Sequence, residues 1–322
     1  MKAIVYRRYG PPDVMRLEEV PRPEPSGDQL LVKIHRVSIN APDWRLMRAS
    51  PFLARFHTGL LSPRFPTLGC DIAGTIEAVG PAARRFRAGD EVFGDLAHFG
   101  YGGFAEYACP SERALARKPK RVGFEAAAAT PMAGMTALQG LRDHGGLRPG
   151  QSVLIVGASG GVGTFAVQIA RLFGADVTAV CSSGKAALAL RLGADRVIDY
   201  TREDFTRGDI RYDLVFAING YRTLAEYRRV LAPSGVYLMV GGKWPQLRDG
   251  LFLAPLWSIG SRQKFAPSVS RSSIRDLVHL GDLLEQGRIE PVIDRRYSLS
   301  EVPDAIRYVE EGHAAGKVII EV

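Results

Sequence analysis

The sequence predicts an α/β protein in which a β-rich domain is combined with a doubly wound parallel sheet. Three observations predict this class. Short β-rich runs punctuated by Gly and Pro extend over residues 1–123. Apolar strands alternate with helical segments over residues 124–261. The alternation then stops, so residues 262–322 are expected to return to the first domain.

The first domain is expected to be an irregular barrel or sandwich. Its β runs are short and closely spaced, and Gly-containing turns separate them, which is typical of such folds. The Pro-rich run at 21–25 predicts a rigid extended link. Strands are expected at residues 2–7, 14–20, 30–38, 72–79, 91–93 and 104–108.

The second domain is expected to hold a parallel sheet covered by helices on both faces, because its strands are almost continuously apolar. Helix-favouring segments on either side of Pro131 precede the sheet. Strands are expected at 152–156, 177–180, 197–198, 214–218 and 236–240, and helices at 162–173, 185–192 and 222–231. The sheet is then complete. Two helices, ending near Gly287 and Gly312, and a final strand at 318–320 form the returning segment.

Composition excludes several classes of protein. With 322 residues, of which 46% are hydrophobic, the chain can bury a core in each of two domains and is neither disordered nor fibrous. Cys70, Cys109 and Cys181 are too far apart for a four-Cys zinc lobe, and a disulfide framework is not expected. The charged segment 1–8 does not match a signal peptide, and no apolar run reaches the roughly 18 residues of a membrane span. A cytoplasmic location is expected.

The formal net charge is +8, from 42 Lys and Arg against 34 Asp and Glu. Most of the cations are arginines, and they are scattered along the chain. The densest local run, residues 84–87, is short. We therefore expect a solvated basic surface and no nucleic-acid partner.

A glycine-rich turn between a strand and a helix is the sharpest local signal. The strand 152–156 leads into Gly157-Ala158-Ser159-Gly160-Gly161-Val162-Gly163 and then into an amphipathic helix. Glycines allow the backbone to approach a pyrophosphate, whose charge is stabilised by free N–H groups at the helix N-terminus. The glycine string on its own is weak evidence for a nucleotide site. Its position between a strand and a helix predicts a dinucleotide site at Ala158, Ser159, Gly160, Gly161, Val162 and Gly163.

The end of the next strand indicates which dinucleotide binds. An Asp or Glu at this place would accept a hydrogen bond from the ribose 2′-hydroxyl of NAD. This chain instead has Ser182, Ser183 and Lys185, and Asp176 lies at the other end of the strand. Two hydroxyls and an ammonium suit a 2′-phosphate, so NADPH is the expected cofactor. The alternative is that the two serines cap the following helix.

Further motifs extend over nearly the whole chain. They are VSINAPD at 37–43, LGCDIAG at 68–74 with VG at 79–80, GDEVFG at 89–94, GGFAEY at 102–107, the loop at 157–163, GAD at 193–195 with VIDY at 197–200, VGG at 240–242 and GHAAGK at 312–317. Together they resemble the medium-chain dehydrogenase/reductase superfamily, in its zinc-independent quinone oxidoreductase-like (zeta-crystallin-like) branch. The resemblance implies a GroES-like catalytic domain, an inserted Rossmann domain and a cofactor cleft between them.

The resemblance also implies roles for single residues. Asn40 and Asp43 would act near the nicotinamide, with Thr136 on the cofactor and Gly241 and Gly242 beside it. Ser182, Lys185 and Tyr200 match 2′-phosphate contacts of similar reductases, and Lys317 matches a late cofactor contact. For Asp43, a capping role in a turn at 43–47 stays an equal alternative.

The sequence departs from zinc-dependent relatives of this superfamily. Those relatives have Cys and a His-Glu pair where this chain has Asn40 and Cys70-Asp71. A catalytic zinc needs three good ligands, and one thiol between Asn and Asp does not supply them. No metal site is therefore expected, and Cys70 is expected to be a small buried residue.

The resulting hypothesis is that NADPH delivers hydride to a quinone or to the β-carbon of an enone. Asn40 would orient or polarise the carbonyl, and water would supply the proton. Two alternatives stay open: an enoyl-thioester reductase, and a non-enzymatic NADPH-sensing, RNA-binding or structural protein. Tyr101 is expected either to line the substrate pocket or to lie in a surface loop. Phe265 is expected either to wall the substrate side or to pack in the core. A homodimer is expected, through the sheet edge near residues 251–257.

Overall fold

The chain forms two compact units. The computed structural model describes residues 1–50, 52, 55–242 and 244–322. One unit consists of Met1–Met132 and Ser272–Val322, and the other is Ala133–Arg271. The units therefore divide after Met132 and Arg271 rather than after residues 123 and 261, because helix α3 (Phe124–Ala129) packs on the first unit's sheet and strand β13 (Lys264–Pro267) joins the second unit's sheet.

The first unit is built around a mostly antiparallel sheet that has seven strands in the described residues. Its order is β14-β15-β3-β4-β5-β7, with β6 paired to β3, while β1 and β2 form a separate antiparallel pair. The strands are β1 (Lys2–Val5), β2 (Arg16–Glu19), β3 (Leu30–Ser38), β4 (Asp71–Val79), β5 (Glu91–Asp95), β6 (Tyr107–Ala108), β7 (Leu115–Arg117), β14 (Ile293–Ser298) and β15 (Lys317–Glu321).

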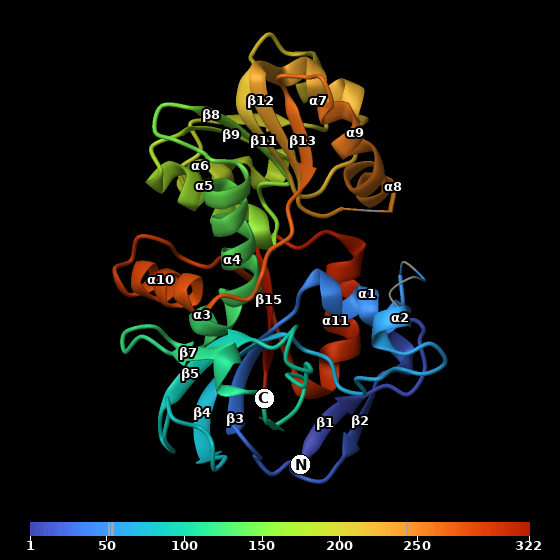
Figure 1. Cartoon of the computed structure of the whole chain (residues 1–322), viewed down its shortest axis with the longest axis vertical. Helices are drawn as coiled ribbons and strands as arrows, with labels where there is room; N and C mark the ends of the chain where they lie inside the picture. Colours follow the sequence, from blue (N-terminus) through green and yellow to red (C-terminus); the bar gives the residue numbers. More distant parts are fainter. Residues whose placement is uncertain (51, 53–54, 243) are drawn as a thin grey trace. The chain divides into compact units, whose positions relative to one another are not determined.

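Helices cover this sheet and join its two sequence segments. Helix α11 packs against α1, and α10 packs against β7, so the C-terminal segment completes the first unit. The helices are α1 (Ala41–Arg48), α2 (Arg55–Thr58), α3, α10 (Ile274–Glu285) and α11 (Val302–Glu311), and α4 (Pro131–Gln139) leads from the first unit into the second. The return of the chain to the first unit is visible in Figure 1 as red segments beside blue and cyan ones.

The second unit is a parallel sheet of six strands within the part of the chain that the structure describes. Its order, β10-β9-β8-β11-β12-β13, is the 3-2-1-4-5-6 order of the Rossmann fold. Helices α5 and α6 pack against β8 to β10, and α7 and α9 against β12 and β13 (Figure 1). The bounds are β8 (Ser152–Val156), α5 (Gly161–Leu172), β9 (Asp176–Cys181), α6 (Ala186–Arg191), β10 (Arg196–Asp199), β11 (Tyr212–Ala217), α7 (Leu224–Val230), β12 (Leu231–Met239), α8 (Trp244–Arg248), α9 (Ala254–Ser258) and β13.

The predicted fold class, a GroES-like β-rich domain with a Rossmann domain, is confirmed, and several element predictions need correction. The sheet of the second unit is not complete before residue 262, because β13 pairs in parallel with β12. β13 has only four residues and ends at Pro267, so its sequence looks like a loop. The expected strand at 104–108 shrinks to β6, and β14 was not expected at all.

The segment after Asn40 is a helix of eight residues, α1, rather than a turn at 43–47. Asn40 is the N-cap residue with extended backbone, and Pro42 lies in the first turn, where its missing N–H costs nothing. The Asp43 carboxylate accepts a hydrogen bond from the Asn40 backbone N–H at 2.8 Å. Asp43 therefore takes part in capping the helix, although the N-cap residue itself is Asn40.

None of the helices in the described residues has the length and apolarity that crossing a membrane requires. The two longest helices of the second and first units, α5 and α10, have 12 residues each. At 1.5 Å per residue, such a helix is about 18 Å long, well short of a hydrocarbon core of about 30 Å.

Phe265 tests whether β13 is an integral strand. Its side chain is 2% exposed and packs against Tyr237 and Trp257. We expect Phe265→Ala to lower the free energy of unfolding by about 3–5 kcal/mol, measured by urea denaturation. Leu190→Ala, at a residue 52% exposed in the same unit, should cost less than about 1 kcal/mol. Equal losses would contradict a packed β13.

Candidate functional site

The turn after β8 has the geometry of a phosphate-binding loop. Gly157 has φ +85°, a conformation that favours glycine. The Gly157 and Ala158 N–H groups both donate to the Val180 carbonyl of β9 at 3.2 Å, which fixes the loop over the sheet. A Cβ on Gly163 would lie 2.2 Å from the Gly157 carbonyl oxygen, so only glycine allows helix α5 to start this close to the loop.

The start of α5 offers free backbone donors. Gly160 is the N-cap residue, and the first helical bond is donated by Thr164 to the Gly160 carbonyl at 2.9 Å. The N–H groups of Gly161, Val162 and Gly163 have no carbonyl acceptor among the described residues, as at any helix start. Together with the helix dipole they suit the pyrophosphate of a dinucleotide, so the loop fits the predicted cofactor. Ala158 and Ser159, also predicted here, are buried in the loop.

The predicted 2′-phosphate residues gather at the C-terminal ends of β9 and β10. Ser182 is the N-cap residue of the turn 183–185, but its hydroxyl makes no capping bond. The Lys185 N–H donates to the Ser182 carbonyl at 2.9 Å, and the Tyr200 N–H donates to the Cys181 carbonyl at 3.2 Å. Tyr200 is exposed. The three residues are therefore brought together, and the proposal that Ser182 merely caps a helix loses support.

Asp199 is a nearby residue that the sequence reasoning missed. It ends β10 and lies opposite Cys181 in the parallel register. Its carboxylate accepts hydrogen bonds from the Ser183 and Thr201 hydroxyls, and these bonds lower its pKa. The signal that could have found it is its place at the end of the strand beside β9. The Ser183 hydroxyl is consequently engaged, and a ligand contact of Ser182 stays a prediction.

Three other predicted cofactor residues also lie in the second unit. The Thr136 hydroxyl is 3.1 Å from the Ser270 hydroxyl, which ties α4 to the segment after β13. Gly241 and Gly242 follow β12, and Gly242 has φ +111°. This φ favours glycine, and a Cβ on Gly242 would also lie 2.1 Å from Oε1 of the buried Gln246. Their contact with a cofactor stays a prediction.

Asn40 lies in the first unit, between the end of β3 and α1, and its side chain is held at both ends. Its Nδ2 donates to the Asp71 Oδ2 at 2.9 Å and to the Ser38 carbonyl at 3.2 Å. Its Oδ1 accepts from the Lys317 ammonium at 2.5 Å. An amide has two N–H donors and two oxygen lone pairs. Both donors of Asn40 are therefore occupied, and one lone pair of Oδ1 remains.

Asp43 is fully buried and holds the segment before β4. Besides the Asn40 N–H, its carboxylate accepts from the Gly69 N–H at 3.1 Å and from the Cys70 thiol at 3.4 Å. Burial raises the pKa of Asp43 to about 6, although these hydrogen bonds oppose the rise. Asp43 therefore links α1 to the 68–70 segment, and a direct catalytic role for it stays untested.

Asp71 and Lys317 form a buried pair beside Asn40. Asp71 begins β4 and also accepts from the Ser38 hydroxyl and from the Met132 N–H, at 3.2 Å and 3.1 Å. The Lys317 ammonium is 3.9 Å from the Asp71 carboxylate. Burial raises the pKa of Asp71 and lowers that of Lys317, because each charged form loses its water. The sequence reasoning gave Lys317 a cofactor contact and no role to Asp71 beyond the zinc comparison.

Comparisons with known proteins place the chain in a family. Residues 26–120 match the family described as alcohol dehydrogenase GroES-like domain, and residues 192–320 match zinc-binding dehydrogenase. The chloroplast envelope quinone oxidoreductase homolog of Arabidopsis thaliana is 31% identical, with 100% of this chain and 98% of that protein covered. The chain belongs to the quinone oxidoreductase-like branch of the medium-chain dehydrogenase/reductase superfamily.

Two further similarities agree with this family. The chloroplastic NADPH-dependent alkenal/one oxidoreductase of Arabidopsis thaliana is 33% identical over 99% of this chain and 79% of that protein. The structure of the quinone oxidoreductase from Coxiella burnetii superposes with a TM-score of 0.89, at 29% identity, covering 100% of this chain and 99% of that one. The similarity thus extends over both units.

The medium-chain dehydrogenase/reductase superfamily also contains zinc enzymes, so we tested the donor set for zinc. No group of His, Cys, Asp and Glu suited to a metal ion occurs among the described residues. The Cys70 thiol donates to Asp43, and burial raises the pKa of Cys70, which keeps it protonated and a poor ligand. Asp71 is already saturated by protein donors. These residues do not fit a catalytic zinc.

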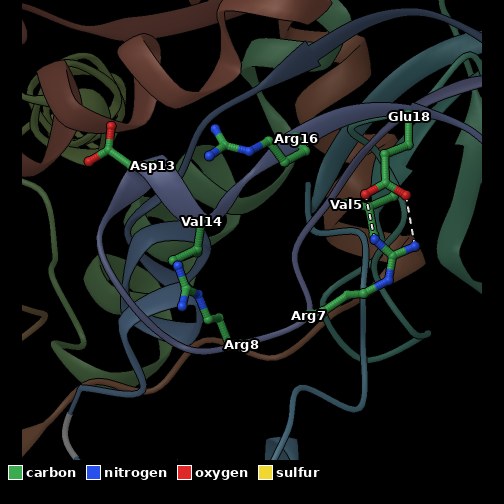
Figure 2. Close-up of a pocket in the computed structure, with 7 residues that line it drawn as sticks. All are labelled: Val5, Arg7, Arg8, Asp13, Val14, Arg16 and Glu18. Carbon is green, nitrogen blue, oxygen red and sulfur yellow. Dashed lines mark hydrogen bonds and ion pairs between the residues drawn. The ribbon is translucent and has the colours of Figure 1, made fainter.

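A separate pocket of about 320 Å³ lies on the β1–β2 side of the first unit (Figure 2). It is lined by Val5, Arg7, Arg8, Asp13, Val14, Arg16 and Glu18. Figure 2 shows Arg7 engaged with Glu18, and Asp13 makes an ion pair with Arg307. None of the predicted site residues lines this pocket, and most of its lining side chains are charged.

Gly163 tests the phosphate loop of this quinone oxidoreductase-like chain. We expect Gly163→Ala to weaken NADPH binding at least about 10-fold, because the added Cβ displaces the loop from the pyrophosphate. Titration followed by NADPH fluorescence measures the affinity. The control is Gly208→Ala, where a Cβ meets nothing within 4 Å and φ is −71°. Unchanged affinity of the Gly163 variant would place the cofactor elsewhere.

Proposed function

We propose that this protein is an NADPH-dependent oxidoreductase that transfers hydride to a quinone or to the β-carbon of an α,β-unsaturated carbonyl compound. The observation that carries the proposal is the complete phosphate loop, followed at the end of β9 by Ser182 and Lys185 in place of an acidic residue. The family supplies the reaction type, since its members above are named quinone and alkenal/one oxidoreductases.

The residues that would hold NADPH are those at the C-terminal ends of the parallel strands. The N–H groups of residues 161–163 suit the pyrophosphate, and Ser182, Lys185 and Tyr200 suit the 2′-phosphate. Thr136, Gly241 and Gly242 would contact the rest of the cofactor. Bound NADPH would supply the hydride. The Asp199 carboxylate would keep the 183–185 turn in place through its hydrogen bond with Ser183.

Asn40 is proposed to orient the reacting groups through its amide oxygen. Polarising a carbonyl requires a free donor, and both N–H groups of Asn40 are already bound to Asp71 and Ser38. The free lone pair on Oδ1 can accept from an amide of the cofactor or from a hydroxyl of the reduced product. The part of the original hypothesis in which Asn40 polarises the carbonyl therefore loses its geometric basis.

The reaction balances without a buried proton donor. Hydride adds two electrons and one proton to the acceptor, which leaves a hydroquinone anion or an enolate. Water can protonate either anion, so the chain needs to position the acceptor more than to supply an acid. We propose that the reaction is zinc-independent, because the donors around Asp71 and Cys70 are committed to one another.

We further propose that the protein is a homodimer formed through the β13 edge of the second unit. β13 is the terminal strand of its sheet, and its outward Phe265 N–H and carbonyl are both hydrogen-bonded to the Ser258 hydroxyl. Large apolar side chains are exposed close by in the sequence: Leu251, Phe252, Leu253, Leu256 and Ile259. A second copy can cover these side chains. A cytoplasmic location also stays a prediction.

Activity measurements test the proposed function. We expect NADPH oxidation with quinones and enones to exceed that with enoyl-CoAs and simple aldehydes, and to exceed NADH oxidation. Chelator should change nothing. Asn40→Ala should lower kcat/KM at least about 10-fold, because the cofactor amide or the product hydroxyl loses its contact with Oδ1. A preference for enoyl-CoA, inhibition by chelator or an unaffected Asn40→Ala variant would each contradict one part of the proposal.

Sedimentation velocity tests the dimer. The wild-type chain is expected to sediment as a dimer at micromolar concentration, and Ile259→Lys, at a residue 76% exposed, is expected to be monomeric. Leu190→Lys is the control, at an exposed apolar residue away from β13. A monomeric wild-type protein would contradict the dimer. A dimeric Ile259→Lys variant would locate the interface elsewhere.

A further inference from the structure

The sheet of the first unit brings Lys317 to Asn40, although 277 positions separate them in the sequence. β15 runs antiparallel to β3, with Ile319 opposite Ser38. The same register, continued by two residues, places Lys317 opposite Asn40. The pairing of two strands that are distant in sequence therefore brings the Lys317 and Asn40 side chains into contact.

The backbone at Lys317 is held on both sides. The Lys317 N–H donates to the Val292 carbonyl at 2.7 Å, and the Ile39 N–H donates to the Val318 carbonyl at 3.0 Å. Gly316, just before it, has φ +112°, and a Cβ there would lie 2.3 Å from the Val292 carbonyl. This tight approach requires glycine. The side chain of Lys317 consequently starts from a fixed point.

The shortest contact of the Lys317 ammonium is with an amide and not with a carboxylate. Its Nζ lies 2.5 Å from Asn40 Oδ1 and 3.1 Å from the Ile39 carbonyl, but 3.9 Å from Asp71 Oδ2. A lysine whose purpose was only to neutralise Asp71 would approach the carboxylate more closely. The observed geometry instead directs the charge at the side chain of Asn40.

This contact determines which way the Asn40 amide faces. An ammonium only donates, so Oδ1 must face Lys317, and Nδ2 then donates to Asp71 Oδ2. Rotating the amide by half a turn would set Nδ2 against the ammonium and Oδ1 against the carboxylate. Both contacts would then be repulsive. The charged pair thus holds one orientation of an amide that would otherwise have two.

The surroundings of Lys317 are acidic and dry. Its side chain is 3% exposed, and the groups that face it are Asp71 of β4, Asp43 of α1, Asp95 at the end of β5 and the thiol of Cys70. A buried ammonium is costly unless it is paired and hydrogen-bonded. Removing it would leave the carboxylates without a cation, so the orientation of Asn40 depends on the charge and not only on shape.

We propose that Lys317 is a positioning residue of the reaction, which acts by holding the Asn40 amide with its free oxygen lone pair in one direction. This inference rests on the proposed role of Asn40. It differs from the cofactor contact that the family resemblance implies for Lys317, because here the ammonium reaches the reacting groups only through Asn40.

A double-mutant cycle tests this dependence. Lys317→Met keeps the length of the side chain and removes the charge and the donors. We expect it to lower kcat at least about 10-fold in the wild-type background and less than about 2-fold in the Asn40→Ala background, because the two residues act as one unit. A structural role for Lys317 would give about the same factor in both backgrounds.

Lys118 provides a matched control. It is also a buried lysine of the first unit, and its ammonium donates to the Pro119 carbonyl at 3.0 Å and to the Val122 carbonyl at 2.5 Å. Lys118→Met should lower the melting temperature as Lys317→Met does but leave kcat unchanged. Equal effects of the two variants on kcat would overturn the proposal.

A second measurement needs no cofactor. The chain has two asparagines, Asn40 and Asn219. In the ¹H–¹⁵N spectrum of the wild-type protein, the two Asn40 side-chain N–H protons should exchange with solvent at least about 10-fold more slowly than those of the exposed Asn219. The reason is that both Asn40 protons are hydrogen-bonded, to Asp71 and to the Ser38 carbonyl. In Lys317→Met the Asn40 pair should shift and exchange faster. Rapid exchange in the wild-type protein would overturn the proposal even if no variant folds.

The outcomes separate this proposal from the proposed function. If Asn40→Ala leaves kcat unchanged, the role of Asn40 is wrong. If Asn40→Ala lowers kcat and Lys317→Met does not, the positioning role of Lys317 is wrong and that of Asn40 stands. If both lower kcat but their effects multiply, Lys317 acts independently of Asn40, and the proposal is again overturned.

Discussion

The need to compensate buried carboxylate charges constrains much of the structure of the first unit. The carboxylates of Asp43, Asp71 and Asp95 are buried where β3, β4 and β15 meet the start of α1. Ionised carboxylates in such a place require donors or a cation. Lys317 is the cation, and the donors are the N–H groups of Asn40, Gly69 and Met132.

Several local features follow from this requirement. Helix α1 starts at Ala41 because the Asp43 carboxylate, in the first turn, accepts a hydrogen bond from the backbone N–H of the N-cap residue Asn40. The 68–70 segment approaches α1 because its N–H and thiol bind the same carboxylate. The start of α4 is fixed because the Met132 N–H binds Asp71. These contacts join three stretches of sequence, near residues 40, 70 and 317, into one cluster that carries its own positive charge. In this cluster the ammonium provides the positive charge, which agrees with the absence of a zinc ligand set among the described residues.

Features with a local physical cause could be predicted from the sequence, and features that depend on distant partners could not. The phosphate loop was found because its glycines, its strand and its helix are neighbours in the chain. A helix ending near Gly287 was expected because apolar residues recur there with the helical period, and α10 ends at Glu285. β13 was missed because a strand of four residues is stable only through its pairing with β12.

The site divides in the same way. Asn40 and Asp43 were proposed from the family resemblance, but their partners came from elsewhere in the chain. Nothing local to Lys317 shows that it lies opposite Asn40, since that depends on the register between β15 and β3. Asp199 was missed for a related reason: a search for an acid after β9 does not find one that ends the adjacent strand. Pair contacts between strands are therefore the information that the sequence reasoning lacked.

The division of the first unit between two chain segments has a consequence for synthesis. Residues 1–132 leave the ribosome before Ala133–Arg271, which can then close its own sheet. Until Lys317 emerges, β3 lacks the neighbour β15, and the buried carboxylates lack their cation. Until β15 has been synthesised, the nascent first unit therefore lacks both the hydrogen bonds of that strand and the positive charge of Lys317.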